Sequence, residues 1–158
     1  MRAAFGLVLV AAMAGGARAA DDDASKADAK ALQGKWQVTA VVKNGEEDGG
    51  IKGLELEFAF TGDKLRVTSA TNKQFGPLDR FMRLGASGDP KVLDLGETEK
   101  GFDTGDGVIE GVYTLDGDTF RWCFALDGDQ PAKRTRPAAV ESRSGSNSIL
   151  ITLKRMKD

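Results

Sequence analysis

Histidine is absent from this 158-residue chain, and cysteine occurs once, as Cys123. Without histidine the chain cannot form a Ser-His-Asp or Cys-His catalytic set, or a zinc site with histidine ligands. A single cysteine also excludes a disulfide within the chain and a cysteine-rich structural zinc site. The remaining acids and nucleophiles form no recognisable catalytic set. We therefore predict a protein that is not an enzyme and holds no metal or cofactor; the enzymatic alternative is a hydrolase that uses two carboxylates as acid and base.

Positive charge is in slight deficit, since 22 Lys and Arg residues face 24 Asp and Glu residues and the net charge is −2. Proteins that bind nucleic acid carry a basic stripe that displaces counterions from phosphate, so we expect no nucleic-acid partner. Two acidic stretches offer oxygen ligands of the kind that Ca²⁺ binds. Their spacing does not fit an EF-hand, and tight turns require Asp and Gly for backbone reasons, so we favour turns without a metal. The acidic residues are Asp103, Asp106 and Glu110 in one stretch, and Asp116, Asp118, Asp127 and Asp129 in the other.

A hydrophobic run long enough to span a bilayer is also missing. The apolar run at 3–14 is too short for a span, follows the basic Arg2 and precedes an Ala-x-Ala cleavage site that ends at Ala19. These features are typical of a signal peptide over residues 1–19. We therefore predict export to the periplasm or the cell exterior, a mature chain without a membrane span, and a flexible lead-in over 20–28.

Alternation of apolar and polar residues dominates the rest of the chain, after a short helical turn expected at 29–33. The clearest strand is 54–60, where every second residue is Leu or Phe. The Gly62-Asp63 pair that follows predicts a two-residue turn, which pairs Phe60 with Leu65.

A second hairpin is predicted around Asp116-Gly117, because Asp-Gly between alternating runs is a strong hairpin signal. This turn pairs Tyr113 with Phe120 and Gly111 with Trp122. A glycine opposite a tryptophan leaves room for the indole, so we expect Gly111 to have a structural role. One face of the hairpin carries Ile109, Tyr113, Leu115, Phe120, Trp122 and Phe124.

About eight strands joined by hairpins, with almost no helix, predict a single all-β domain over 29–158. The pattern favours an up-and-down antiparallel barrel of lipocalin or calycin type, because closure leaves no exposed sheet edge. In the first strand the even-numbered residues from Trp36 to Val42 are expected to face inward. The connections 46–53 and 96–107 are expected to be loops at the rim. The remaining strands are expected at 36–43, 78–84, 91–95 and 148–156, with a shorter extended stretch at 140–143.

Gly34-Lys35-Trp36 at the start of the first strand resembles the Gly-x-Trp signature of lipocalins. The wider pattern resembles a planctomycete-type family of small secreted domains of unknown function, and the resemblance covers nearly all of the chain after residue 19. Its motifs are Leu32-Gln33-Gly34-Lys35-Trp36, Leu54-x-Leu56-x-Phe58, Pro90-Lys91-x-x-Asp94-Leu95, Gly111-Val112-Tyr113-x-Leu115-Asp116-Gly117-Asp118-Thr119, Cys123-Phe124-Ala125, Arg136-Pro137 and Leu153-Lys154-Arg155.

The resemblance implies a signal peptide and a lipocalin-like barrel, and it implies no activity or catalytic residue. In lipocalins a basic side chain from the last strand stacks on the signature tryptophan at the closed end of the barrel. Strand alternation places Arg155 on the inward face, so we predict a structural cation–π contact between Arg155 and Trp36.

Large aromatic side chains are the candidate binding residues. An eight-stranded barrel has enough interior either to be filled by side chains or to hold one small ligand. Two functions therefore remain open: a carrier or sensor that binds a small apolar ligand in the barrel, and a module with a filled barrel that contacts or inhibits another protein of the cell envelope. In either case we expect a monomer. The candidate ligand-binding residues are Phe58, Phe60, Tyr113, Phe120, Trp122 and Phe124.

Cys123 is expected on the outward face of its strand, two residues from Arg121. A neighbouring arginine can lower the pKa of a thiol and make it reactive. The alternative, which we favour, is a small semi-buried apolar residue without a chemical role.

Overall fold

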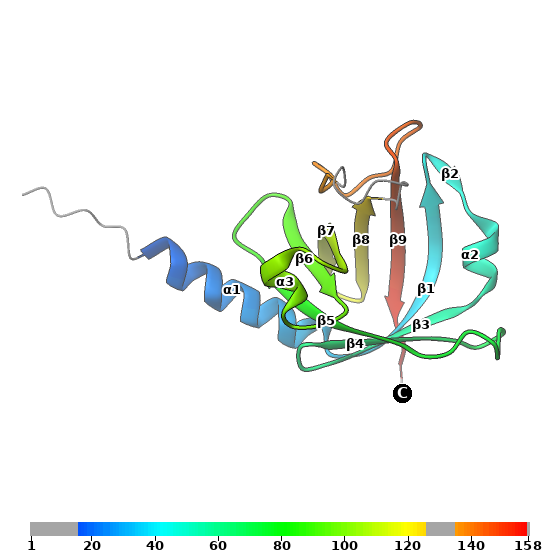
Figure 1. Ribbon diagram of the computed structural model, residues 1–158, viewed down its shortest axis with the longest axis horizontal. Helices are drawn as coiled ribbons and strands as arrows, with labels where there is room; N and C mark the ends of the chain where they lie inside the picture. The colour runs from blue at the N-terminus through cyan, green and yellow to red at the C-terminus, as the bar shows by residue number, and fades with distance from the viewer. Residues whose placement is uncertain (1–15, 126–134, 158) are drawn as a thin grey trace, which may run out of the picture.

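Eight antiparallel strands close into a barrel in the computed structural model of the protein (Figure 1). They are β1 (Gly34–Lys43), β3 (Leu56–Thr61), β4 (Lys64–Ser69), β5 (Leu78–Gly85), β6 (Lys91–Gly96), β7 (Val108–Asp116), β8 (Thr119–Ala125) and β9 (Ser148–Arg155). Each of these strands pairs with the next, and β1 pairs with β9 as well. The structure describes residues 16–125 and 135–157. The predicted up-and-down barrel is confirmed.

The two ends of the barrel carry different elements. At the end where β1 starts and β9 finishes lies helix α1 (Gly16–Leu32), and we call this the closed end. Figure 1 shows α1 extending away from the barrel, with its last turns beside the start of β1. The connections at the opposite, open end contain the short strand β2 (Glu46–Glu47), helix α2 (Gly49–Gly53) and helix α3 (Gly101–Thr104).

The two predicted hairpins have different outcomes. In β3–β4, Phe60 pairs with Leu65 around a Gly-Asp loop, as predicted. In β7–β8, Tyr113 pairs with Trp122, two positions further along than predicted. The loop there is also Gly-Asp, because Gly117 has a positive φ of 55° and the preceding aspartate still belongs to the strand. A shift of two residues keeps each side chain on its predicted face, so the predicted inward face is correct although the register is wrong.

A bulge in β1 changes which of its side chains face the core. The pairing of β1 with β9 shifts between Val38 and Ala40. Because a bulge inserts one unpaired residue, the inward alternation passes from Val38 to Val41. Val41 is buried in the main core, whereas Val42 packs against a small cluster on the outer face. The prediction that Ala40 and Val42 face inward is therefore wrong.

Helix α1 replaces both the short turn predicted at 29–33 and the flexible lead-in predicted at 20–28. Its residues are held to the barrel by distant partners: the Ala86 amide donates to Ser25 Oγ at 3.1 Å, and Lys91 Nζ donates to Asp28 at 2.7 Å. Contacts between residues so far apart in the sequence leave no local signal. None of the helices formed by the described residues is long and apolar enough to cross a membrane.

The predicted rim loops contain short helices. In 46–53, Asp48 caps α2 by accepting a hydrogen bond from the Ile51 amide at 2.9 Å. Leu54, predicted as the start of a strand, instead ends α2, and Glu55 after it has a positive φ of 46°, so β3 begins later. In 96–107, α3 forms a single turn. The stretch 140–143, predicted as extended, forms no strand.

Candidate functional site

The closed end of the barrel is filled by aromatic rings. Phe120 lies at their centre, with ring centroids 6.0 Å from Trp36, 5.9 Å from Phe60 and 5.9 Å from Tyr113. All four side chains are buried, as is Leu32 from α1. Edge-on and tilted ring pairs at these distances are stabilising beyond the area that they bury. Three of the six candidate binding residues, Phe60, Tyr113 and Phe120, therefore belong to a packed core.

The predicted contact between Arg155 and Trp36 is confirmed, with the guanidinium 4.2 Å from the centroid of the indole. The two residues are directly opposed in the β1–β9 pairing. Arg155 also donates to the Gln33 carbonyl at 3.0 Å and to the Ala31 carbonyl at 2.6 Å, beyond and within the last turn of α1. A cation at this position satisfies carbonyls that a helix end leaves without partners. Arg155 thus fastens α1 over the closed end.

Asp28 on α1 is a structural residue that the sequence pattern did not reveal. Its carboxylate accepts a hydrogen bond from the Tyr113 hydroxyl at 2.7 Å and another from Lys91 Nζ at 2.7 Å. Burial of the phenol, reinforced by the hydrogen bond to Asp28, raises the pKa of Tyr113 far above its ordinary value. Asp28 lies in an acid-rich stretch where no spacing distinguishes it from its neighbours. Asp28, which lies outside the barrel on α1, thus holds this helix to the closed end.

Gly111 lies against the indole of Trp122, as predicted, although its cross-strand partner is Phe124. A Cβ at Gly111 would lie 2.2 Å from Nε1 of Trp122. This nitrogen donates to the Leu93 carbonyl at 3.1 Å, and the Trp122 and Phe124 rings stack with centroids 4.2 Å apart. Gly111 therefore sets the position of an aromatic pair in the half of the interior nearest the open end, which we call the open half.

Half-buried apolar side chains surround the open half. They come from α2, from the connections beside it and from the open-end termini of β7 and β8, and they pack against the main core. We call this set the apolar mouth. Of the two predicted rim connections, 46–53 contributes Ile51 to this set and 96–107 contributes no member. The mouth consists of Ile51, Leu54, Phe75, Ile109 and Phe124.

The six candidate residues are therefore divided between two environments. Phe60, Tyr113 and Phe120 fill the closed end, whereas Trp122 and Phe124 line the open half. Phe58 is buried next to Phe60, with centroids 6.4 Å apart, so its ring contact is with the closed-end set. The sequence pattern predicted the inward orientation of all six residues and not this division.

Cys123 belongs to a second, smaller apolar cluster on the outer face, with Val112 and Leu150. The thiol is fully buried and donates to the Glu141 carbonyl at 3.2 Å. Burial raises the pKa of the Cys123 thiol, and it outweighs the opposing influences of the hydrogen bonds to Ser148 and to the Glu141 backbone and of the nearby Arg121 charge. The alternative of a reactive thiol with a lowered pKa is therefore contradicted, and Cys123 is more deeply buried than predicted.

The chain covers this outer cluster with its own segment 135–143. Val140 packs on the cluster, and Arg136 fixes the segment by donating to both oxygens of Asp94, at 2.5 and 3.0 Å, and to Glu110 at 3.1 Å. The pKa of Arg136 is raised, chiefly by its hydrogen bonds to Asp94. Two members of the predicted acidic stretches, Asp127 and Asp129, lie outside the described residues.

No family model and no curated protein matches the chain. Among solved structures, the chain is similar to a crystal structure of a point mutant of the fluorescent protein UnaG, with 10% sequence identity and a TM-score of 0.43. The match covers 82% of this chain and 99% of that chain.

Proposed function

We propose that the protein is an exported binding protein that holds one small apolar ligand in the open half of its barrel. The difference between the two ends carries this proposal. Rings at the closed end are buried against one another, whereas the five side chains of the apolar mouth are only half-buried. Accessible apolar and aromatic side chains with few polar groups among them are the usual lining of a small-molecule site.

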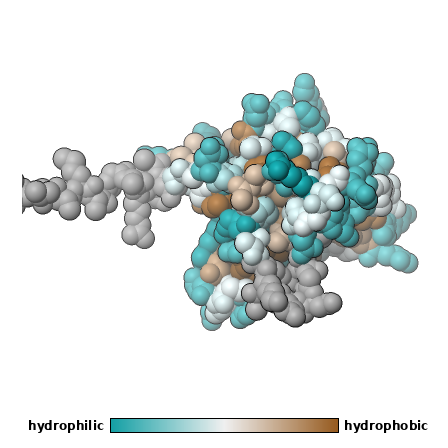
Figure 2. Space-filling model, turned by 90° about the horizontal axis from the view of Figure 1, so that it is seen from above, coloured by the Kyte–Doolittle hydropathy of each residue, from teal (hydrophilic) through white to brown (hydrophobic). Residues whose placement is uncertain are grey.

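The surface gives less support to the alternative of a protein-interaction module. In the described part of the chain, the large apolar side chains that are exposed are Leu78 and Met156. On the face seen in Figure 2, outside the grey atoms, apolar residues occur as separate spots between hydrophilic ones. The outer apolar cluster is covered by the chain itself, so it does not offer the broad patch that marks many docking surfaces.

Export is supported by the signal-like pattern of residues 1–19. The prediction is that the protein recovered from its host begins near Ala20, as measured by intact-mass spectrometry. A chain that retains residues 1–19 would contradict it.

The two tryptophans of the chain allow the proposed site to be tested by fluorescence, because Trp36 lies at the closed end and Trp122 in the open half. Brominated decanol serves as an apolar probe, since its heavy atom quenches a tryptophan that it touches. Trp36→Phe leaves Trp122 as the reporter, and Trp122→Phe leaves Trp36. We expect saturable quenching in the first variant and little in the second.

A matched pair of phenylalanine variants provides the control. Phe124→Ala removes a half-buried ring from the apolar mouth, and we expect weaker probe binding. Phe81→Ala removes a half-buried ring from the outer face of β5, where Lys64 lies 5.3 Å from its centroid, and we expect unchanged binding. Equal quenching of both tryptophans, or no saturable quenching of Trp122, would contradict the proposed site.

A further inference from the structure

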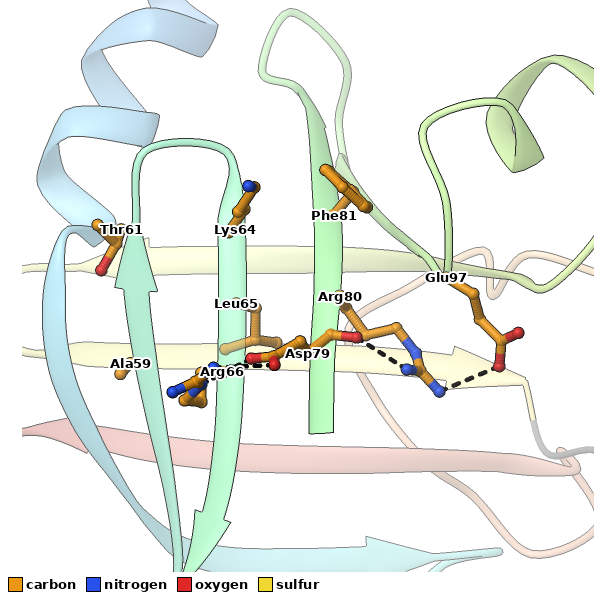
Figure 3. A pocket seen from close by; sticks show the side chains of 9 residues that line it. All are labelled: Ala59, Thr61, Lys64, Leu65, Arg66, Asp79, Arg80, Phe81 and Glu97. Carbon is orange, nitrogen blue, oxygen red and sulfur yellow. Dashed lines mark hydrogen bonds and ion pairs between the residues drawn. The ribbon is translucent and has the colours of Figure 1, made fainter. Parts of the chain in front are cut away.

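Strand β5 extends beyond its pairing with β4. That pairing ends with Lys64 opposite Phe81, whereas β5 continues to Gly85. Figure 3 shows these two paired side chains beside the β3–β4 turn, with β5 continuing past the turn. The last part of β5 therefore has β6 on one side and, within the described chain, no strand on the other. An edge of this kind leaves backbone donors and acceptors unpaired unless another element reaches them.

The free side of β5 carries three successive backbone positions, and two of them are satisfied. The positions are Met82, Leu84 and Ala86, because the direction of the backbone groups alternates along a strand. The Met82 amide donates to the Asp63 carbonyl of the β3–β4 turn at 2.7 Å. The Ala86 amide donates to Ser25 Oγ of α1 at 3.1 Å. Between them, no hydrogen bond from the turn or from the described residues of α1 reaches the N–H and C=O of Leu84.

A hollow of about 490 Å³ lies between α1 and this edge. Its apolar lining is Ala29 of α1 with Met82 and Leu84 of β5, which belong to or pack against the main core. Gln33 holds α1 to the β3–β4 turn at one end of the hollow, through hydrogen bonds of 2.7 and 3.1 Å with the Gly62 backbone. The rest of the lining consists of Ser25, Lys26, Lys30, Gln33, Gly62 and Asp63.

We propose that this hollow binds an extended segment of a partner protein, which adds to the free edge of β5 as a short strand. A residue of the segment opposite Leu84 accepts a hydrogen bond from its amide and donates one to its carbonyl. The apolar lining then receives a side chain of the segment. A purely apolar small molecule would leave both backbone groups of Leu84 without partners, which is costly, so the edge favours a polypeptide.

This inference goes beyond the proposed function, because the hollow lies beside α1 at the closed end and the small ligand is assigned to the open half. A segment bound in one extended conformation obtains its affinity from main-chain hydrogen bonds and from one or two side-chain pockets. Such a site needs no broad apolar patch on the surface.

The first test uses a short fluorescein-labelled peptide of alternating threonine and valine residues, which favour strands. We expect saturable binding by fluorescence anisotropy, together with a shift and slower hydrogen exchange of the Leu84 amide by NMR. The same peptide with N-methylated backbone amides should bind about tenfold more weakly, because methylation removes the donors that pair with the edge.

Two alanines of α1 provide a matched pair of variants. Ala29 lines the hollow, whereas Ala27 is exposed and is not part of the lining. Ala29→Leu fills part of the hollow and should weaken binding of the peptide about tenfold. Ala27→Leu makes the same change in the same helix, with the same small effect on helix propensity, and should leave binding unchanged. Circular dichroism checks that both variants fold.

Three outcomes would overturn the proposal: no saturable binding of the peptide, equal binding of the methylated peptide, or equal effects of the two variants. If the protein alone dimerises on concentration and the Leu84 amide shifts as it does so, the hollow belongs to a second copy, and the proposal is also wrong. Quenching of Trp122 by brominated decanol should not change when the peptide binds, so the peptide site and the small-ligand site can each fail separately.

Discussion

The closed and open ends of the barrel use similar aromatic residues in different ways. At the closed end, Phe120 contacts three other rings, and α1 covers them with Asp28 and Leu32. At the open end, the Trp122–Phe124 pair is bordered by half-buried side chains from short helices and connections. The contacts that close the first end join segments far apart in the chain, whereas the mouth is built largely from connections between strands.

This difference separates the residues that stabilise the fold from those available for binding. A ring surrounded by other rings cannot be removed without leaving a cavity, because protein interiors are packed to the density of organic crystals. A half-buried ring at a mouth loses less when it is removed, and its neighbours have room to adjust. Stability is therefore expected to depend on the closed end, and ligand affinity on the open end.

The largest effect is expected from two equivalent substitutions at opposite ends. Phe120→Ala should lower the free energy of unfolding by about 3–5 kcal/mol, because it leaves a cavity among buried rings. Phe124→Ala should lower it by about 1 kcal/mol, because this ring is only half-buried. Urea unfolding followed by circular dichroism measures both values. Similar losses of unfolding free energy in the two variants would contradict the proposed difference between the ends.

A smaller effect is expected from Gly111→Ala. The new Cβ would lie 2.2 Å from Nε1 of Trp122 and 2.9 Å from the Cys123 carbonyl, and a backbone atom cannot move aside as a flexible side chain can. Overpacking of this kind costs about 1–3 kcal/mol, and it should also displace the indole from the Leu93 carbonyl.

Gly111→Ala therefore tests whether the packing of the open half contributes to stability as well as to binding. We expect both the free energy of unfolding and the quenching of Trp122 by brominated decanol to fall. Gly117→Ala is a useful contrast, since nothing lies within 4 Å of its Cβ position and its cost comes from the positive φ of a turn. If Gly111→Ala leaves the Trp122 emission spectrum and probe binding unchanged, the glycine does not position the indole.

The two hairpins show how far the sequence predicts this fold. Both loops are Gly-Asp, but the second is preceded by another aspartate, and the sequence Asp-Gly-Asp fits two registers equally well. Alternation decides which face is apolar, so the inward residues were predictable although the pairing was not. The bulge in β1 was not predictable, because Ala40, Val41 and Val42 are all apolar and carry no alternation.

A site residue could be predicted where alternation within its own strand defines it, and could not where contacts with other elements define it. The contact of Arg155 with Trp36 followed from the lipocalin-like motif together with strand alternation. Asp28 carried no such signal, because the partner that defines it, Tyr113, belongs to another element. The sequence thus predicts side chains that alternate within strands better than contacts made between elements.

A more modest effect than that of Phe120→Ala is expected from the hydrogen bond that joins α1 to the closed end. Burial of the phenol, reinforced by the hydrogen bond to Asp28, raises the pKa of Tyr113 above its ordinary value of 10.0, so the folded protein holds the neutral phenol while the unfolded chain loses the proton near that value. The stabilisation is complete below about pH 10 and is lost as the pH rises above it.

Tyr113→Phe should cost about 1.5 kcal/mol at neutral pH, from the lost hydrogen bond to a carboxylate, and should flatten the alkaline loss of stability. Because Tyr113 is the one tyrosine of the chain, tyrosinate absorbance reports it alone, and it should appear only as the protein unfolds. Ionisation of Tyr113 near pH 10 in the folded protein would mean that α1 does not seal the closed end.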